Sequence, residues 1–286
     1  MAIPMNSICM LCQMNKHVEE ARKLDTDKAE AFTKDLLEIL KNALGRSNSA
    51  MEASSINKLY QRYFGLEQDR FVQEKKMSNE FIKSRLDGIT RLVEAQADPV
   101  FAALQFAVLG NYLDFAALHG QVSFEKLDAM LEDALNMPLD PAVYENLCRD
   151  LETAKKLLYV TDNAGEIGFD KVLALQLQKK YPQLQITFCV RGLPVHNDAT
   201  REDAAFMELE FEIIDTGNDV GGVEFSLLSA QAKQAFDTAD VVLAKGMGNT
   251  ESMYGCGYNI YYAFLVKCAR FAQYFDKPLM TPMLIR

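Results

Sequence analysis

Residues that could bind a metal ion gather in one short stretch, TDNAGEIGFD, at positions 161–170. Asp162 and Asn163 offer carboxylate and amide oxygens, Gly165 permits a tight turn, and Glu166 follows directly. Oxygen donors without a thiolate or a pair of histidines are typical of a site for a hard divalent cation such as Mg²⁺ or Mn²⁺. The alternative is an ordinary strand-to-helix turn in which an Asp or Asn side chain caps the helix. Both interpretations apply to this stretch taken alone.

Three later segments carry polar side chains of complementary chemistry. Arg191 and Asp198 lie in VRGLPVHNDAT, Asp215 and Asp219 belong to DTGND, and Lys245 begins KGMGNTE. Asp198 adds a third oxygen ligand for a divalent cation. The two cations beside glycine-rich turns are typical of a site for a phosphate or carboxylate anion. A cation site next to an anion site indicates phosphoryl chemistry.

The four polar segments follow apolar runs that have the length of buried strands. The predicted strands are 157–161, 186–190, 211–215, 241–244 and 279–285, and the predicted helices between them are 166–181, 198–207, 225–236 and 251–274. This alternation predicts an α/β fold: a doubly wound, mostly parallel sheet in an α/β/α sandwich. The carboxyl ends of parallel strands lie along one edge of a sheet, so we expect the polar segments to meet there.

The first half of the chain has a helical pattern and almost no strand-like runs. Apolar residues recur at three- and four-residue spacing in 31–44, 81–93 and 100–118. We therefore predict an N-terminal all-helical domain at residues 1–150 and an α/β metal- and phosphate-binding domain at residues 151–286.

Two polar residues, Asn111 and Asp114, interrupt the apolar helix predicted at 100–118. They are three positions apart, so they share one face of that helix. Polar side chains in such apolar surroundings need partners. Either they bond to neighbouring backbone or they line a polar cleft.

The cysteine pair Cys9 and Cys12 has the C-x-x-C spacing. No second pair at zinc-site spacing follows, and His17 is the only extra ligand nearby, so a zinc site would be incomplete. The alternative is that two thiols one helical turn apart are packed in the first helix.

Composition limits the classes of partner. The 286-residue chain has a formal net charge of −10 and no basic block, which argues against nucleic acid or an anionic membrane as the main partner. No apolar run approaches the roughly 20 residues that span a bilayer, and the first residues do not resemble a secretory signal. We therefore expect a cytoplasmic protein whose six cysteines are reduced. The oligomeric state has no signal in the sequence.

Three better-known phosphate-binding patterns do not match the segment after the first predicted strand. Ala164 follows Asp162-Asn163 where a haloacid-dehalogenase-type phosphatase has a second aspartate, and only Gly165 and Gly168 are present where a dinucleotide-binding loop needs three glycines. A Gly-Lys-Ser/Thr loop is absent. Methyltransferases use a looser glycine-rich turn, so this class stays open.

The polar motifs taken together resemble those of a known family. They are Asp162-Asn163-Ala164-Gly165-Glu166 with Phe169-Asp170, Arg191-Gly192 with Pro194 and Asn197-Asp198-Ala199-Thr200, and Lys245-Gly246-Met247-Gly248-Asn249 with Glu251. In this order they resemble the DUF89 family of metal-dependent damage-control phosphatases. Gly110-Asn111 with Asp114, and the Cys9-x-x-Cys12 pair, are similar to features of its stand-alone prokaryotic branch. His196 departs from the pattern, which leads us to expect an aliphatic residue there.

The resemblance implies hydrolysis of small phosphomonoesters, either sugar phosphates or damaged phosphometabolites, with a divalent metal (Mn, Ni, Co or Mg) as cofactor. The metal ligands would be Asp162, Asn163 and Asp198; the phosphate would be bound by Lys245 with Gly246, Gly248 and Asn249; and Arg191, Glu166, Asn111 and Asp114 would line the site. A small phosphorylated metabolite is then the expected partner.

Two mechanisms and three functional classes follow from these residues. In one mechanism Asp198 or Glu166 orients the attacking water or takes its proton; in the other an aspartate, Asp162 being a candidate, is the nucleophile. A phosphatase, an S-adenosylmethionine-dependent methyltransferase and a non-catalytic phospho-ligand sensor all remain. The methyltransferase is disfavoured because Arg191 stands after the second predicted strand, where an acidic residue would hold a ribose.

Overall fold

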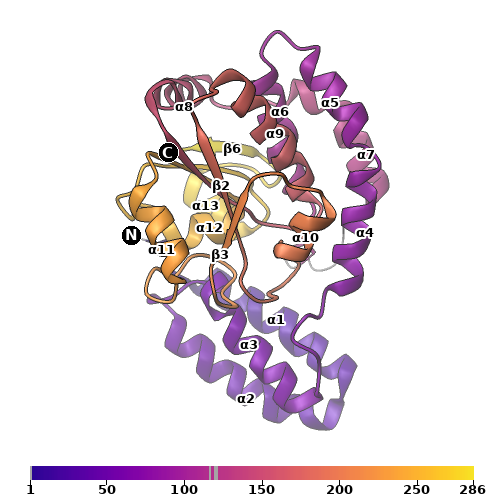
Figure 1. Cartoon of the computed structure of the whole chain (residues 1–286). Helices are drawn as coiled ribbons and strands as arrows, with labels where there is room; N and C mark the ends of the chain where they lie inside the picture. Colours follow the sequence, from indigo (N-terminus) through magenta and orange to yellow (C-terminus); the bar gives the residue numbers. More distant parts are fainter. Residues whose placement is uncertain (1, 116, 119–121) are drawn as a thin grey trace.

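The protein has one central sheet with helices on both faces, seen here in a computed structural model that describes residues 2–115, 117–118 and 122–286 (Figure 1). The strands of the described part are β1 (Lys156–Val160), β2 (Gln185–Val190), β3 (Glu212–Asp215), β4 (Val241–Lys245), β5 (Ile260–Leu265) and β6 (Pro282–Ile285). They lie in the order β3-β2-β1-β4-β5-β6, and only β6 is antiparallel to its neighbour. The predicted α/β fold with a mostly parallel sheet is confirmed.

The strand order places a topological switch point in the middle of the sheet. From β1 the chain proceeds outward through β2 and β3, and then returns to β4 on the other side of β1. Val160 at the end of β1 pairs with Cys189 of β2 and with Ala244 of β4. Loops that leave β1 and β4 therefore diverge from a common point, which is where open α/β sheets bind ligands.

The two faces of the sheet are covered by different sets of helices. The helices before the sheet are α1 (Ser7–Leu24), α2 (Thr26–Ala43), α3 (Ser49–Phe64), α4 (Val72–Lys83), α5 (Leu86–Glu94), α6 (Pro99–Gly110), α7 (Phe124–Glu132), η1 (Ala134–Asn136) and α8 (Pro141–Thr153). Those within it are α9 (Glu166–Lys180), α10 (Arg201–Phe206), α11 (Ala230–Thr238), α12 (Gly246–Met253) and α13 (Ala269–Phe275). Helices α4–α10 pack on one face, and α11–α13 on the other. None of these described helices is long and apolar enough to cross a bilayer.

Helices α1, α2 and α3 form a separate packed group at one end of the molecule (Figure 1). Phe32, Leu36 and Tyr60 are fully buried in a core of their own. Helices α4–α8 instead share a core with the sheet, and α6 lies against α9. The division of the chain into domains at residue 150 stays a prediction.

The structure corrects two predicted helices. The helix predicted at 100–118 ends at Gly110, so Asn111 and Asp114 lie in the turn after α6 and not on one helix face; residue 116 lies outside the described residues. The helix predicted at 251–274 is wrong, because this segment contains the end of α12, strand β5 and most of α13. The residues of β5 are all buried and apolar, and periodicity alone does not separate such a short run from a buried helix.

Candidate active site

The loops after β1 and β2 are joined at the switch point. Asn163 and Asp198 form an isolated antiparallel bridge. The backbone N–H of Ala199 donates to the carbonyl of Asp162 at 2.7 Å, and that of Ala164 donates to the carbonyl of Asn197 at 2.8 Å. The predicted oxygen ligands are thus brought together by main-chain hydrogen bonds between the two loops.

The carboxylate of Asp162 is buried and held in a fixed position. Its Oδ2 accepts hydrogen bonds from the Nδ2 of Asn111 and of Asn163, each at 2.8 Å. Gly246 lies against this carboxylate with φ of 81°, and a Cβ at that position would overlap the Asp162 oxygens. Glycine is therefore required at the start of α12 both by the backbone angle and by the close approach.

Asp198 is held from behind by Arg191. The Nε of Arg191 donates to Asp198 Oδ2 at 2.6 Å, and both side chains are buried. The remaining guanidinium nitrogens donate to the carbonyl of Gly222 at 3.0 Å and to Asn249 Oδ1 at 3.0 Å. Arg191 and Asn249, both predicted to contact substrate, are thus engaged with the protein behind the Asp198 carboxylate.

The two carboxylates suit a divalent cation. Burial, followed by the nearby charges of Asp198 and Glu166, raises the pKa of Asp162 well above its usual range. Burial also raises the pKa of Asp198 to about 6 in spite of Arg191. Neighbouring buried carboxylates repel each other unless a cation lies between them. The amide of Asn163 turns its Nδ2 toward Asp162 and Glu166, so Oδ1 is the atom of this side chain that could coordinate a cation.

The described residues contain no cluster of three or more His, Cys, Asp or Glu side chains placed to hold a metal ion. The set at the switch point consists of two carboxylates and one amide, which matches the preference of hard cations for oxygen ligands completed by water. The residues present therefore fit a cation of the magnesium or manganese type.

Lys245, predicted to bind phosphate, points away from the loops and into the sheet–helix layer. Its ammonium donates to Glu166 Oε1 at 2.6 Å, to Asp170 Oδ1 at 3.0 Å and to the carbonyl of Ala107 at 2.7 Å. The hydroxyl of Tyr159 donates to the same Asp170 oxygen at 2.7 Å. All three hydrogens of the ammonium are used, and the side chain is fully buried.

Glu166 is enclosed by this layer. Its carboxylate accepts from Asn163 Nδ2 at 2.8 Å and from Asn111 Nδ2 at 3.1 Å, in addition to the ion pair with Lys245. It is completely buried. Glu166 therefore orients the two asparagine amides beside Asp162.

A cation missed by the sequence prediction, Lys267, lies in the loop after β5. Its Nζ contacts Asp114 Oδ2 at 2.6 Å and donates to the carbonyl of Asn111 at 2.6 Å. Burial alone would raise the pKa of Asp114, but the charge of Lys267 lowers it overall. The available signal was a lysine directly after the apolar run IYYAFLV, the same strand-end position that Lys245 occupies after VVLA.

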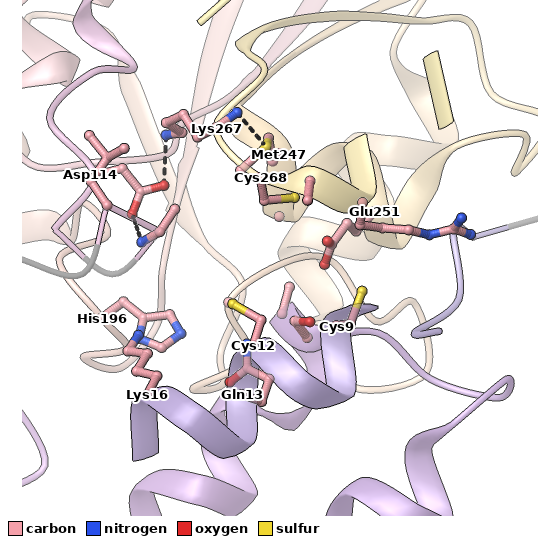
Figure 2. A pocket seen from close by; sticks show the side chains of 18 of the residues that line it. Cys9, Cys12, Gln13, Lys16, Asp114, His196, Met247, Glu251, Lys267 and Cys268 are labelled. Atoms are coloured by element: carbon pink, nitrogen blue, oxygen red, sulfur yellow. Dashed lines mark hydrogen bonds and ion pairs between the residues drawn. The ribbon is translucent and has the colours of Figure 1, made fainter. Parts of the chain in front are cut away.

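A cavity of about 460 Å³ opens onto these groups (Figure 2). Its described lining includes the predicted Asp114, Asp162, Asp198 and Gly248, together with Lys267. Further lining comes from Cys9, Cys12, Gln13, Lys16, His196, Glu251, Cys268 and Arg270. Within the described residues, the predicted Asn111, Asn163, Glu166, Arg191, Lys245, Gly246 and Asn249 lie outside this lining.

The turn at Gly165 is supported from the helical half, by residues that the sequence prediction did not include. The backbone N–H of Gly165 donates to Asn79 Oδ1 at 2.7 Å, and the Nδ2 of Asn79 donates to Asp203 Oδ1 at 2.7 Å. Lys75 forms a buried ion pair with Asp203 at 3.0 Å. Helix α4 thus fixes the loop that carries Asp162.

We predict a pH-dependent effect of replacing Glu251 with Gln. Burial raises the pKa of Glu251 from its ordinary value of 4.5 to about 7, although Arg270 lowers it; Asp114 raises it further. Between these pKa values the folded protein binds more protons than the unfolded chain, so wild-type stability falls as pH rises. Gln does not titrate, so the variant does not lose stability in this way. Its unfolding free energy should exceed that of the wild type by up to about 3 kcal/mol at pH about 8 and by almost nothing below pH about 4.5.

Urea denaturation of wild type and Glu251→Gln across this pH interval measures the difference directly. Cys9 and Cys268 also lie close enough to Glu251 to be affected by its charge, and both thiols are unchanged in the variant. A stability difference that is the same at both ends of the pH interval would contradict the assignment.

The chain is similar to known proteins over almost its whole length. The profile of the damage-control phosphatase ARMT1-like domain matches residues 5–281. An uncharacterized protein of Methanocaldococcus jannaschii is 32% identical over 281 residues, which cover 93% of this chain and 90% of that protein. A damage-control phosphatase of Archaeoglobus fulgidus is 29% identical over 253 residues and covers 86% of each chain.

A solved structure has the same fold throughout. The crystal structure of a DUF89 family protein from Pyrococcus horikoshii superposes with a TM-score of 0.83 at 27% identity and covers 99% of this chain and 98% of that one. A damage-control phosphatase of the same organism is 31% identical over 188 residues, 65% of this chain and 63% of that protein. These relatives support a phosphatase role over the methyltransferase and sensor alternatives. The chain belongs to the damage-control phosphatase (DUF89, ARMT1-like) family.

Proposed function

We propose that this protein is a metal-dependent phosphatase that hydrolyses small phosphomonoesters, such as sugar phosphates or damaged phosphometabolites. One observation carries the proposal: two buried carboxylates, Asp162 and Asp198, share a cavity at the switch point of the sheet with the buried cation Lys267. Paired carboxylates suit a divalent metal, and a nearby ammonium suits the oxygens of a phosphoryl group.

Asp162, Asp198 and Asn163 Oδ1 would hold the metal, with Asn111 and Glu166 orienting them. When bound, a divalent metal neutralises charge on a phosphoryl group and lowers the pKa of water. Manganese, nickel, cobalt and magnesium are the candidates. Arg191 keeps one Asp198 oxygen in place through its Nε–Oδ2 hydrogen bond.

Lys267 is our candidate for the main phosphate-binding side chain, in the role that the sequence had assigned to Lys245. Its ammonium lines the cavity and is paired with Asp114, and the phosphate would share this cation with the Asp114 carboxylate. The backbone of Gly248, near the start of α12, lines the same cavity and is a second candidate contact.

Asp198 is our candidate for orienting the attacking water or accepting its proton. Of the two carboxylates considered for this role, Asp198 lines the cavity, whereas Glu166 is enclosed by Asn111, Asn163 and Lys245. Formation of a phosphoenzyme on Asp162 is the competing route. A carboxylate-bound phosphoryl analogue trapped with a metal fluoride would favour that route.

The test of the function is phosphate release by the purified protein. A panel of sugar phosphates and one aryl phosphate is incubated with Mn²⁺, Ni²⁺, Co²⁺ or Mg²⁺, and again after treatment with a chelator. We expect release that depends on added metal and is lost on chelation. Release that is unaffected by chelation would contradict the metal dependence, and no release with any substrate or metal would contradict the proposed activity.

Replacing Lys267 with Gln tests the phosphate contact. Loss of a buried cation from the anion site should raise KM for a sugar phosphate by about tenfold or more, since a hydrogen bond to a charged group contributes about 1.5–3 kcal/mol. Steady-state kinetics measure the change. Lys277→Gln, at an exposed lysine of the same segment, is the matched control and should leave KM unchanged. An unchanged KM in Lys267→Gln would contradict the assignment.

A further inference from the structure

One side of helix α1 faces the cavity. Ile8, Cys9, Cys12, Gln13 and Lys16 all line it, and their spacing places them on a single side of a helix. We call this set the α1 face. Figure 2 shows it across the cavity from Met247, Cys268 and Lys267. The N-terminal helical group therefore supplies a large part of the cavity wall, although it has a separate core.

The two thiols of the α1 face have the properties of neutral wall residues. Burial raises the pKa of both Cys9 and Cys12, so neither is a thiolate at neutral pH. Among the described residues, no group of three or more His, Cys, Asp or Glu side chains is placed to hold a metal ion at this pair. Neutral thiols behave as small apolar groups, and the C-x-x-C pair thus presents a smooth, weakly polar surface to the cavity.

The other end of the α1 face is polar. Burial lowers the pKa of Lys16 overall, although the charge of Asp114 across the cavity raises it. The Oε1 of Gln13 is hydrogen-bonded to His17 Nε2 at 2.9 Å, so this amide offers the cavity its Nε2 donor group. Glu251 and Arg270 also line the cavity, and Figure 2 shows Glu251 near Cys9.

The cavity is larger than a phosphoryl group requires. Its volume of about 460 Å³ is within the range of ligand pockets for whole small molecules. If the phosphate lies between Asp162, Asp198 and Lys267, the rest of the ester must extend into the remaining space, which the α1 face bounds. The wall there combines a thiol surface with hydrogen-bonding groups, which suits a carbon skeleton bearing hydroxyl groups.

We propose that the α1 face is the specificity-determining surface of the enzyme. Cys12 contacts the carbon skeleton of the leaving group, and Gln13 and Lys16 donate hydrogen bonds to its hydroxyl oxygens. Among the small phosphomonoesters already proposed, this surface favours those whose leaving group is polyhydroxylated and about the size of a sugar. This inference rests on the proposed phosphatase function.

The first test replaces Cys12 of α1 with Phe, so that the larger side chain occupies part of the cavity. Activity on a hexose 6-phosphate is compared with activity on glycerol phosphate, whose leaving group is smaller. We expect kcat/KM for the hexose phosphate to fall by about tenfold or more and that for glycerol phosphate to change less than about twofold, because only the larger group meets the new ring. Leu11→Phe, on the exposed side of the same helix, is the control and should change neither value.

The outcomes separate the two proposals. A wild-type protein that hydrolyses no phosphomonoester overturns the function itself. A wild-type protein that is active, with a Cys12→Phe variant that loses equal activity on both substrates or on neither, overturns the specificity role of α1 and leaves the function standing.

A second test does not depend on a folded Phe variant. Wild-type protein with its metal is treated with iodoacetamide, with and without a non-hydrolysable phosphonate analogue of hexose 6-phosphate, and alkylation of each cysteine is followed by mass spectrometry. We expect the analogue to slow alkylation of Cys12 several-fold, while Cys256, outside the described cavity lining, reacts at an unchanged rate. Equal rates at Cys12 with and without the analogue would overturn the inference.

Discussion

Replacing Asp162 with Ala is expected to lower metal-stimulated phosphate release by about a thousandfold or more, a loss typical of removing a central electrostatic group. The same variant should lose tight binding of Mn²⁺ in isothermal titration calorimetry, which gives a readout independent of turnover. The variant should remain folded, because removing the Asp162 carboxylate also relieves its repulsion with the buried carboxylate of Asp198.

The control for this prediction is Asp215→Ala. Asp215 also ends a strand of the sheet, but its carboxylate pairs with Arg201 near the surface and is outside the described cavity lining. Its removal should leave both metal binding and activity near the wild-type values. Full activity in Asp162→Ala would refute the assignment of Asp162 as a ligand.

Replacing Lys245 with Met is expected to cost about 3–5 kcal/mol of unfolding free energy, the usual effect of removing one partner from a buried ion pair. Met fills a similar volume, so the loss arises from Glu166 and Asp170, which would remain buried without their cation. Urea denaturation near neutral pH measures the change. Activity should fall as well, since Glu166 orients the amides beside Asp162.

A partly exposed lysine on α11 gives a matched comparison. Lys233 forms an ion pair with Asp237 one helical turn away, and Lys233→Met should leave the unfolding free energy close to the wild-type value because solvent screens such pairs. If Lys245→Met were as stable as Lys233→Met and only raised KM, Lys245 would bind the phosphate, as the sequence alone had led us to expect.

The strands that carry the site were predictable because their signal is local. LLYV and VVLA are short continuous apolar runs, each followed at once by polar residues and glycine, and this pattern is typical of a central parallel strand. The switch point then follows from topology. Strand β5 was not predicted, because its apolar run, IYYAFL, was assigned together with the apolar residues of α13 to one long helix. Lys267 was therefore not predicted as a site residue, since only its position directly after a strand indicates that role.

The position of a charged residue at a strand end does not show whether its side chain points into the cavity or into the protein interior. Leu243 and Lys245 lie on the same face of β4, two positions apart, and both point into the layer with α6 and α9. Alternation along the strand explains why the two side chains share a face, but the carboxylates that pair with Lys245 come from a separate helix, α9. The ion pair of Arg191 could not be predicted either, because its partner Asp198 is seven residues away across a loop.

The separate core of α1–α3 has a consequence for how this enzyme can change. The groups proposed for chemistry sit on the sheet and its loops, whereas the surface proposed to choose the leaving group sits on a helix whose own packing relies on residues such as Phe32 and Tyr60. Substitutions along the α1 face can therefore alter the range of esters accepted without disturbing the carboxylates. Substrate range and catalytic power can thus evolve, or be engineered, one at a time.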